Sequence, residues 1–314
     1  MTNQLLTYTS TGAKIFQHNP LLLKLKAEIP TAYPITLQVA PTSRCNLKCS
    51  FCSNAKRNKH EDLDINVLKR FILDLKKIGL KAVEITGGGD PTMYDEINEL
   101  ISFCHKIKLD VGMITNGILL GKVIEKENLD ILKWVRISAN SLEYTEEFNI
   151  PEIKGTLGFS LCMHENIQAV VHERLTNFVN KYKPSYVRVV PDCLPSDSEE
   201  TVRRCAKEFV EFKGRPYFYQ DKHFQRPDRC YWHYLKPFLL HDGYVYPCSS
   251  VVLNSGSEGV FHHRYRWIHM SDLLSKYKKE MVSFNTVSCN RCVFTEQNVL
   301  IDSIIHPSGM ENFI

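Results

Sequence analysis

The amino-acid sequence predicts an α/β fold built on a parallel sheet. Two observations lead to this prediction. Short runs of β-branched and apolar residues alternate with longer stretches that carry apolar residues at helical spacing, and the alternation continues from about residue 34 to residue 190. Since strand–helix–strand units have one favoured hand, consecutive units build a single sheet. The periodicity alone does not decide whether this sheet is open or curls into a barrel.

Six strands are expected along this part of the chain. Each is a short run rich in Val, Ile, Leu or aromatic residues, and a turn or a helical pattern follows it. The expected strands are Ile35–Val39, Ala82–Thr86, Leu109–Thr115, Trp134–Ser138, Thr156–Met163 and Tyr186–Pro191.

Helical periodicity occupies the intervals between these strands. The clearest stretch has apolar residues at positions 67, 68, 71, 72, 75 and 78 and ends at Gly79, a typical helix stop. Similar stretches occur around residues 97–104 and 167–178. After about residue 225 the periodicity fades, and aromatic residues, Gly and Cys dominate. We therefore expect an N-terminal extension (residues 1–33), an α/β domain (34–225) and a smaller C-terminal domain (226–314).

The composition excludes several classes of protein. With 43% hydrophobic and 24% charged residues, the chain is neither disordered nor collagen-like. No apolar run is long enough to span a membrane, and Met1–Phe16 lacks the apolar core of a secretory signal, so we expect a cytoplasmic protein without a membrane partner. A net charge of +4 over 314 residues gives no direct evidence for nucleic-acid binding.

The most informative number is the count of 11 cysteines. In a cytoplasmic protein, many cysteines indicate metal or redox chemistry rather than disulfides. Seven of them fall into two groups. The other four, which are expected to be small buried apolar residues, are Cys104, Cys162, Cys193 and Cys205.

The first group is a C-x3-C-x2-C run formed by Cys45, Cys49 and Cys52, just after the first expected strand. Three thiolates cannot complete the usual four-ligand set of a [4Fe–4S] cluster, so one iron would stay open for chemistry. The carboxyl ends of parallel strands are also where α/β folds build their active sites. A structural zinc knuckle is the alternative, but this is not its usual spacing.

This run, with the aromatic Phe51 before its last cysteine, resembles the signature of the radical S-adenosylmethionine (radical SAM) superfamily. The resemblance continues through the segment 86–91 (Thr-Gly-Gly-Gly-Asp-Pro), which is similar to a glycine-rich element of that family, and through 114–117 and 136–138 at the ends of later strands. It implies a partial (βα)6 barrel of the TIM type.

The resemblance also implies residues that contact S-adenosylmethionine. Glycines without a Cβ allow a close approach of the backbone to a ligand, and Asp90 stands where many members have Glu. Thr115, Ser138 and Asn140 have the equal alternative of capping strand ends, and Arg188 is expected to meet the carboxylate of S-adenosylmethionine. The full predicted set is Phe51, Gly87, Gly88, Gly89, Asp90, Thr115, Ser138, Asn140 and Arg188.

Three polar residues of the expected strands have two open interpretations. Glu84 lies two residues before Thr86, so both side chains are expected on the same face of the strand and toward the barrel interior. Glu84, together with Arg188 and Asp192 of the sixth unit, is either a substrate ligand or a structural partner.

The second group is Cys230, Cys248, Cys289 and Cys292, spaced C-x17-C-x40-C-x2-C. It resembles the twitch domain of radical SAM enzymes, or the first half of the longer SPASM domain, and implies one auxiliary [4Fe–4S] cluster. No cysteine follows Cys292, so the second SPASM cluster is not expected. A zinc ribbon uses similar C-x2-C pairs and is the alternative.

The family resemblance implies an enzyme that takes one electron from a reductant such as flavodoxin or ferredoxin. It would cleave S-adenosylmethionine to methionine and a 5′-deoxyadenosyl radical, which abstracts hydrogen from a substrate. The reaction expected first is oxidation of a carbohydrate- or nucleoside-like small molecule, with the auxiliary cluster accepting the second electron. The alternatives are modification of a peptide substrate and a non-catalytic iron–sulfur or zinc-binding protein.

Overall fold

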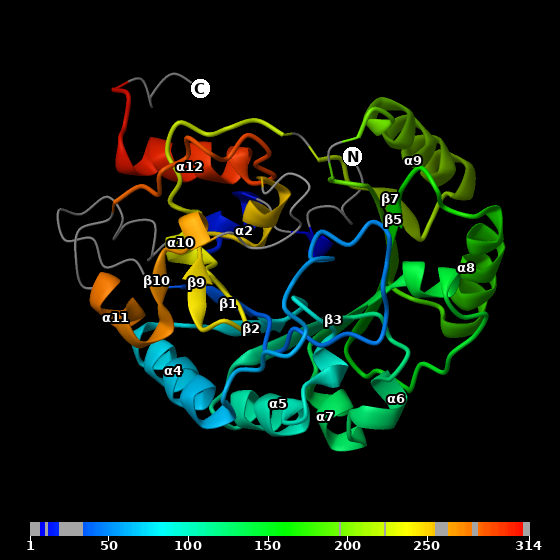
Figure 1. Ribbon diagram of the computed structural model, residues 1–314, viewed down its shortest axis with the longest axis horizontal. Helices are drawn as coiled ribbons and strands as arrows, with labels where there is room; N and C mark the ends of the chain where they lie inside the picture. Colours follow the sequence, from blue (N-terminus) through cyan, green and yellow to red (C-terminus); the bar gives the residue numbers. More distant parts are fainter. Residues whose placement is uncertain are drawn as a thin grey trace.

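The computed structural model describes residues 7–9, 12–18, 34–194, 196–222, 224–254, 263–277 and 282–309. Within these residues ten strands form one sheet, in the order β10-β9-β8-β1-β2-β3-β4-β5-β6-β7. The strands from β1 to β7 are all parallel and curve around the interior of the molecule (Figure 1). The predicted α/β fold is confirmed, and its curved parallel sheet is that of a partial barrel.

The first six parallel strands lie within one residue of their predicted bounds. The seventh, β7, is a three-residue aromatic run after Pro216, too short to show the alternation that identifies a strand. The parallel strands are β1 (Thr36–Val39), β2 (Ala82–Ile85), β3 (Asp110–Thr115), β4 (Trp134–Ser138), β5 (Thr156–Met163), β6 (Tyr186–Pro191) and β7 (Tyr217–Tyr219).

Helices follow one another around the outer side of the sheet (Figure 1). The first of them starts at Asp64, whose carboxylate accepts hydrogen bonds from two backbone N–H groups, and stops at Gly79 with a φ of 131°. These elements are α4 (Ile65–Ile78), η1 (Pro91–Met93), α5 (Ile97–Lys106), α6 (Leu120–Val123), α7 (Lys126–Ile131), η2 (Ala139–Glu143), α8 (Ala169–Tyr182) and α9 (Glu199–Lys213).

The chain after residue 226 continues the same sheet. The short β8 pairs in parallel with β1, and β9 and β10 add to it as antiparallel strands. The domain boundary near residue 225 therefore stays a prediction, and no break in the sheet marks it. The elements of this part are α10 (Trp232–Leu235), β8 (Phe238–Leu239), β9 (Tyr244–Tyr246), η3 (Ser249–Asn254), η5 (His263–Tyr265), β10 (Ile268–His269), η6 (Met270–Asp272), α11 (Leu273–Lys276) and α12 (Thr295–Ile305).

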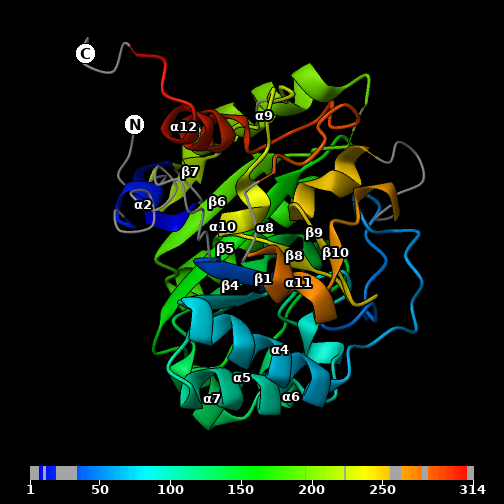
Figure 2. The same ribbon diagram turned by 90° about the vertical axis from the view of Figure 1, so that its left-hand side faces the viewer.

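Only part of the predicted N-terminal extension lies among the described residues. It includes the short helix α2 (Gly12–Phe16), which lies beside α12 (Figure 2). A Cβ placed on Gly12 would come within 3.1 Å of the side chain of Leu300 in α12. The helices α2 and α12 are thus packed together.

The parallel strands present different residues to the two faces of the sheet. In β4, Val135 and Ile137 are buried in the core that the helices cover, while Arg136 between them points to the barrel interior. At the amino ends of β4 and β6, the rings of Trp134 and Tyr186 lie directly over Gly112 and Gly158 of the neighbouring strands. We call Trp134, Tyr186 and Tyr8, which stacks on Tyr186 with a centroid distance of 4.2 Å, the aromatic floor.

This packing predicts that Gly158→Ala destabilises the protein. The new Cβ would lie 2.1 Å from the Tyr186 ring, so the ring has to move, at a cost of about 1–3 kcal/mol. The matched control is Gly121→Ala in α6, where the nearest heavy atom is 3.4 Å away and alanine favours the helix. Urea unfolding of both variants measures the difference, and equal stability of Gly158→Ala and the parent would contradict the prediction.

Candidate functional site

Cys45, Cys49 and Cys52 lie together in the loop between β1 and α4, and all three side chains are partly exposed. Burial, followed by the neighbouring Cys52 thiol, raises the pKa of Cys49 to about 12. Burial also raises the pKa of Cys45, to which Cys52 contributes as well. The three thiols thus lie in one loop, and Cys52 lies near enough to influence both of the others.

Hydrogen bonds of neighbouring residues hold this loop, and two thiols accept further ones: Cys45 from the N–H of Leu47 at 3.4 Å and Cys52 from Arg57 at 3.9 Å. Thr42 donates its hydroxyl to the carboxylate of Asp62, and Arg44 forms an ion pair of 2.6 Å with the same carboxylate. Arg57 donates from Nε to the carbonyl of Ser43 at 2.6 Å and from Nη1 to that of Asn54 at 2.7 Å. Contacts on both sides of the three cysteines therefore hold the loop.

The glycine-rich segment after β2 lies directly against the cysteine loop. The backbone N–H of Gly89 donates to the carbonyl of Thr42, and that of Asp90 to the carbonyl of Arg44, both at 2.8 Å. A Cβ on Gly89 would sit 1.9 Å from the carbonyl oxygen of Arg44. A Cβ on Gly88 would sit 2.8 Å from the ring of His241. At these two positions the need for glycine comes from contacts within the protein.

Asp90 connects the ends of β2 and β3. Its buried carboxylate accepts hydrogen bonds from the N–H and hydroxyl of Thr92, from the hydroxyl of Thr115 at 2.9 Å and from the N–H of Asn116 at 2.7 Å. Asn116 in turn donates to Asn46 of the cysteine loop. Asp90 and Thr115 thus position the loop, and their contact with S-adenosylmethionine stays a prediction.

Asn140 lies two residues after Ser138, just past the end of β4. The Asn140 amide donates to the carbonyl of Cys162 in β5 and accepts from its N–H, at 2.8 and 2.7 Å. This geometry is that of a strand-end bridge, one of the two interpretations open for Asn140. Ser138 is the last residue of β4 and is partly exposed.

Phe51 stacks on the ring of His164, with a centroid distance of 4.7 Å. His164 follows β5 directly, and its Nε2 lies 3.0 Å from the carboxylate of Glu143 at the end of η2. Tyr144 accepts a hydrogen bond from the N–H of Ser50 in the cysteine loop. The carboxyl ends of β4 and β5 therefore hold the loop from the side away from the glycines.

Sequence reasoning missed His164 and Glu143. Their signal is their place after the ends of two strands, but many polar residues follow strands. Only the stacking of His164 on Phe51 distinguishes it from an ordinary turn residue.

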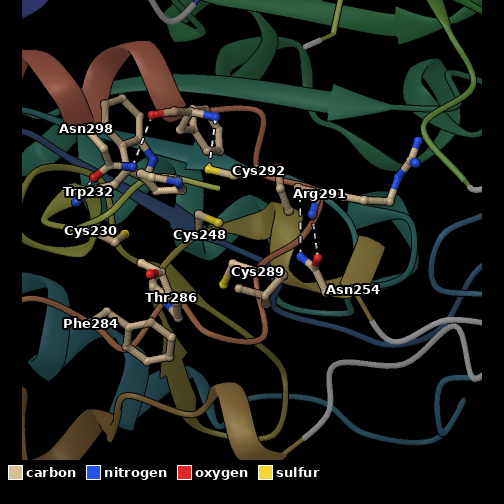
Figure 3. A pocket seen from close by; sticks show the side chains of 15 residues that line it. Cys230, Trp232, Cys248, Asn254, Phe284, Thr286, Cys289, Arg291, Cys292 and Asn298 are labelled. Carbon is tan, nitrogen blue, oxygen red and sulfur yellow. Dashed lines mark hydrogen bonds between the residues drawn. The ribbon is translucent and has the colours of Figure 1, made fainter. Parts of the chain in front are cut away.

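The second group of cysteines lines one pocket (Figure 3). Its members come from three places: the start of α10, the turn after β9, and the C-x2-C loop before α12. Burial, followed by the neighbouring thiols, raises the pKa of Cys230 to about 12 and that of Cys289 to about 11. The structure thus brings together Cys230, Cys248, Cys289 and Cys292, as their spacing predicts.

Four cysteine thiols are a donor set that both a [4Fe–4S] cluster and a zinc ion accept. Among the described residues, no three His, Cys, Asp or Glu side chains gather tightly enough to hold a single metal ion. A [4Fe–4S] cluster takes each cysteine on a different iron, so its four thiolates surround a space rather than a point. Four thiols around one pocket fit that requirement.

Arg291 fastens the second cysteine site to the barrel. It lies inside the C-x2-C pair, and its guanidinium donates to the carbonyl of Cys193 at 3.2 Å and to the carboxylate of Glu199 at 3.1 Å. Its backbone N–H donates to Asn254 at 2.7 Å (Figure 3). The loop that carries two of the four thiols is therefore anchored to the connection between β6 and α9.

The four single cysteines were expected to be buried, and only one of them is. Cys104 is buried in α5, and Cys162 and Cys193 are partly exposed. Cys205 is exposed, so the expectation was wrong there, because Cys205 lies on the solvent side of α9.

Comparison with known proteins gives a family for the first part of the chain. Residues 39–147 match the model of the Radical SAM superfamily. The GTP 3′,8-cyclase of Clostridium perfringens is 30% identical over 156 residues, which are 46% of this chain and 48% of that relative. The chain spans no more than about half the length of the curated relatives it matches.

Solved structures share the fold over a larger part of the chain. Streptococcus suis SuiB bound to S-adenosylmethionine has a TM-score of 0.56 at 16% identity, covering 87% of this chain and 72% of that one. The structure of anSMEcpe with bound AdoMet and the Cp18Cys peptide has a TM-score of 0.51 at 15% identity, covering 78% and 79%. In the described part of this chain, no helix is long and apolar enough to cross a membrane.

The hydrogen bonds of Asp90 predict that Asp90→Asn is destabilising. An amide has one acceptor oxygen, and its NH2 group would face donors from Thr92, Thr115 or Asn116, at a cost of about 1–3 kcal/mol. Asp110→Asn, at an exposed position of β3, is the control. Urea unfolding of the metal-free proteins measures this cost, and an Asp90→Asn variant as stable as Asp110→Asn would show that the network is dispensable.

Proposed function

Because this chain contains a radical SAM domain, we propose that Cys45, Cys49 and Cys52 bind a [4Fe–4S] cluster at which S-adenosylmethionine is reductively cleaved. The observation that supports this proposal most is the close packing of the glycine-rich segment on a loop that gathers three thiols. When bound there, S-adenosylmethionine supplies a 5′-deoxyadenosyl radical, which takes a hydrogen atom from the substrate.

The chain's own residues prepare this chemistry. Three cysteines leave one iron without a protein ligand. The hydrogen bonds of Asp90 to Thr115 and Asn116 hold the cysteine loop against the ends of the strands. Gly87 and Ser138 are partly exposed at the carboxyl ends of β2 and β4, next to this loop. Both positions are open to a ligand, which supports their predicted contact with S-adenosylmethionine.

We further propose that Cys230, Cys248, Cys289 and Cys292 hold an auxiliary [4Fe–4S] cluster in a twitch-like domain. With four protein ligands it has no open iron, so its proposed role is electron transfer rather than cleavage of S-adenosylmethionine. The shared pocket of the four thiols, in a chain whose residues 39–147 match the Radical SAM superfamily model, supports this proposal, and a zinc ribbon is the alternative.

The proposed reaction is oxidation of a carbohydrate- or nucleoside-like small molecule in the cytoplasm, with flavodoxin or ferredoxin as the one-electron reductant. The relatives named GTP 3′,8-cyclase support a nucleotide-like substrate. Peptide modification is the second candidate, because SuiB was solved with its precursor peptide SuiA and shares this fold. A product two hydrogens lighter, formed with one S-adenosylmethionine consumed, would distinguish oxidation from rearrangement.

We predict that Cys45→Ala, Cys49→Ala and Cys52→Ala each abolish formation of 5′-deoxyadenosine while the fold survives. The loop is fixed by Thr42, Asp62 and Arg57, so losing one thiol removes a cluster ligand and leaves the scaffold. Cys205→Ala, at an exposed position, is the control. The assay uses anaerobically reconstituted protein with dithionite, and a single variant that matches the parent rate would refute the assignment.

We predict about eight irons per chain in the reconstituted parent and about four in the Cys45/Cys49/Cys52 triple Ala variant. Both numbers follow from two four-iron clusters. Iron and zinc analysis of the anaerobic protein measures them. One zinc together with about four irons in the parent would replace the auxiliary cluster with a zinc ribbon.

A further inference from the structure

The barrel interior contains a group of cations that the proposed chemistry does not use. Arg136 in β4 and Arg188 in β6 point inward from the middle of their strands, and Lys222 follows β7. They influence one another: Arg136 lowers the pKa of Arg188, and both arginines lower that of Lys222. Arg188 also donates a hydrogen bond to Gln220, two residues before Lys222, so the three cations lie near one another.

Among the described residues, both arginines donate hydrogen bonds only to neutral groups. Arg188 donates to the hydroxyl of Ser160 at 2.9 Å and to the amide oxygen of Gln220 at 3.0 Å. Arg136 donates to the hydroxyl of Tyr186 at 2.9 Å and to the backbone carbonyl of Tyr8 at 2.8 Å. Within the described chain, no carboxylate forms an ion pair with either of them.

Lys222, like the two arginines, has no ion pair with a carboxylate among the described residues. Burial, followed by the nearby Arg188, lowers the pKa of its amine to about 8. The carboxylate of Glu84 also lies in the interior, but it already accepts from Lys236 at 2.9 Å and from Gln38 at 2.8 Å. Against the effect of burial, Lys236 and then both arginines lower the pKa of Glu84, so one carboxylate shares the interior with four cations and three positive charges are in excess.

An excess of this kind is costly in a folded protein, because desolvated charges without a counter-charge lose their hydration and repel one another. Arg136 also lies over the rings of Trp134 and Tyr186, 5.5 and 5.6 Å from their centroids, but neither ring carries a net negative charge. Guanidinium groups match the paired oxygens of phosphates and carboxylates, and an ammonium adds a further donor. A bound anion would supply the charge that the site lacks.

We propose that Arg136, Arg188 and Lys222 bind an anionic group of the substrate, a phosphate or a carboxylate, inside the barrel. This inference rests on the proposed function and names its substrate class, a small anionic molecule. Arg188 precedes the last residue of β6 by three positions, so it lies roughly 10 Å below the strand ends that carry the cysteine loop. The anionic group of the substrate binds at that depth, and the neutral part of the substrate extends toward the cysteine loop.

Binding of simple anions to the anaerobically reconstituted full chain tests the proposal. Inorganic phosphate, pyrophosphate and succinate are the probes, and calorimetry gives their affinities. Arg188→Gln and Lys222→Gln should each weaken the preferred anion about tenfold. The controls Arg70→Gln and Lys122→Gln remove exposed cations and should leave the affinity unchanged. Preference for phosphate or for succinate identifies which anionic group the site takes.

Thermal unfolding separates an anion site from a structural role. Without anion, Arg188→Gln should melt no lower than the parent, because it removes an unbalanced charge. Added anion should raise the melting temperature of the parent and not of the variant. A variant that melts lower without anion and binds the probe as tightly as the parent would overturn the proposal.

Two further measurements distinguish a failure of the anion site from a failure of the proposed function. Formation of 5′-deoxyadenosine without substrate should be equal in the parent and in the control Lys122→Gln. If the parent forms none, the proposed function fails regardless of anion binding. If Arg188→Gln loses affinity for S-adenosylmethionine and keeps its affinity for the probe, Arg188 holds the carboxylate of S-adenosylmethionine and the anion site is refuted.

Discussion

The backbone contact between Gly89–Asp90 and the loop residues Thr42 and Arg44 is the constraint on which the candidate site depends. Two N–H···O bonds of 2.8 Å join segments that follow two neighbouring strands, and no side chain fits between them at Gly89. The Asp90 carboxylate extends this contact to β3 through Thr115 and Asn116. The strand ends and the cysteine loop therefore form one rigid unit, and the three thiols keep their places relative to the barrel.

Sequence reasoning reached the parallel strands and both cysteine groups because each has a local signal. Alternating or apolar runs identify the strands, and fixed spacing identifies the cysteines. It missed β7 and the parallel pairing of β8 with β1, since a strand of two or three residues has no periodicity and its partner lies far away in the sequence. The partners of Asp90 and Phe51 were also out of reach, because they depend on how separate strands are placed beside each other.

The second cysteine site is structurally continuous with the first. The parallel pair β8–β1 joins the chain after residue 226 to the strand that leads into the cysteine loop. Just after β8, His241 packs on Gly88 and pairs with Glu61 at 2.9 Å, so the C-terminal part touches the glycine-rich segment itself. Arg291 adds a second anchor at the other side of the barrel. An electron-transfer role for the C-terminal cysteines requires a fixed separation from the barrel, and these contacts supply one.

The outer face of the sheet packs against helices and stabilises the fold, whereas the inner face contains the residues proposed to bind substrate. Along β4 and β6, the residues that face the helices are fully apolar, and the residues between them are Arg136 and Arg188. Because side chains alternate with a period of two, a strand can contribute to the core with one set of residues and to the interior with the other. Helix packing on the outer face provides the stability that the charged interior lacks. The protein can therefore keep Arg136 and Arg188 in its interior although they do not stabilise the fold. This leaves them available to bind a ligand.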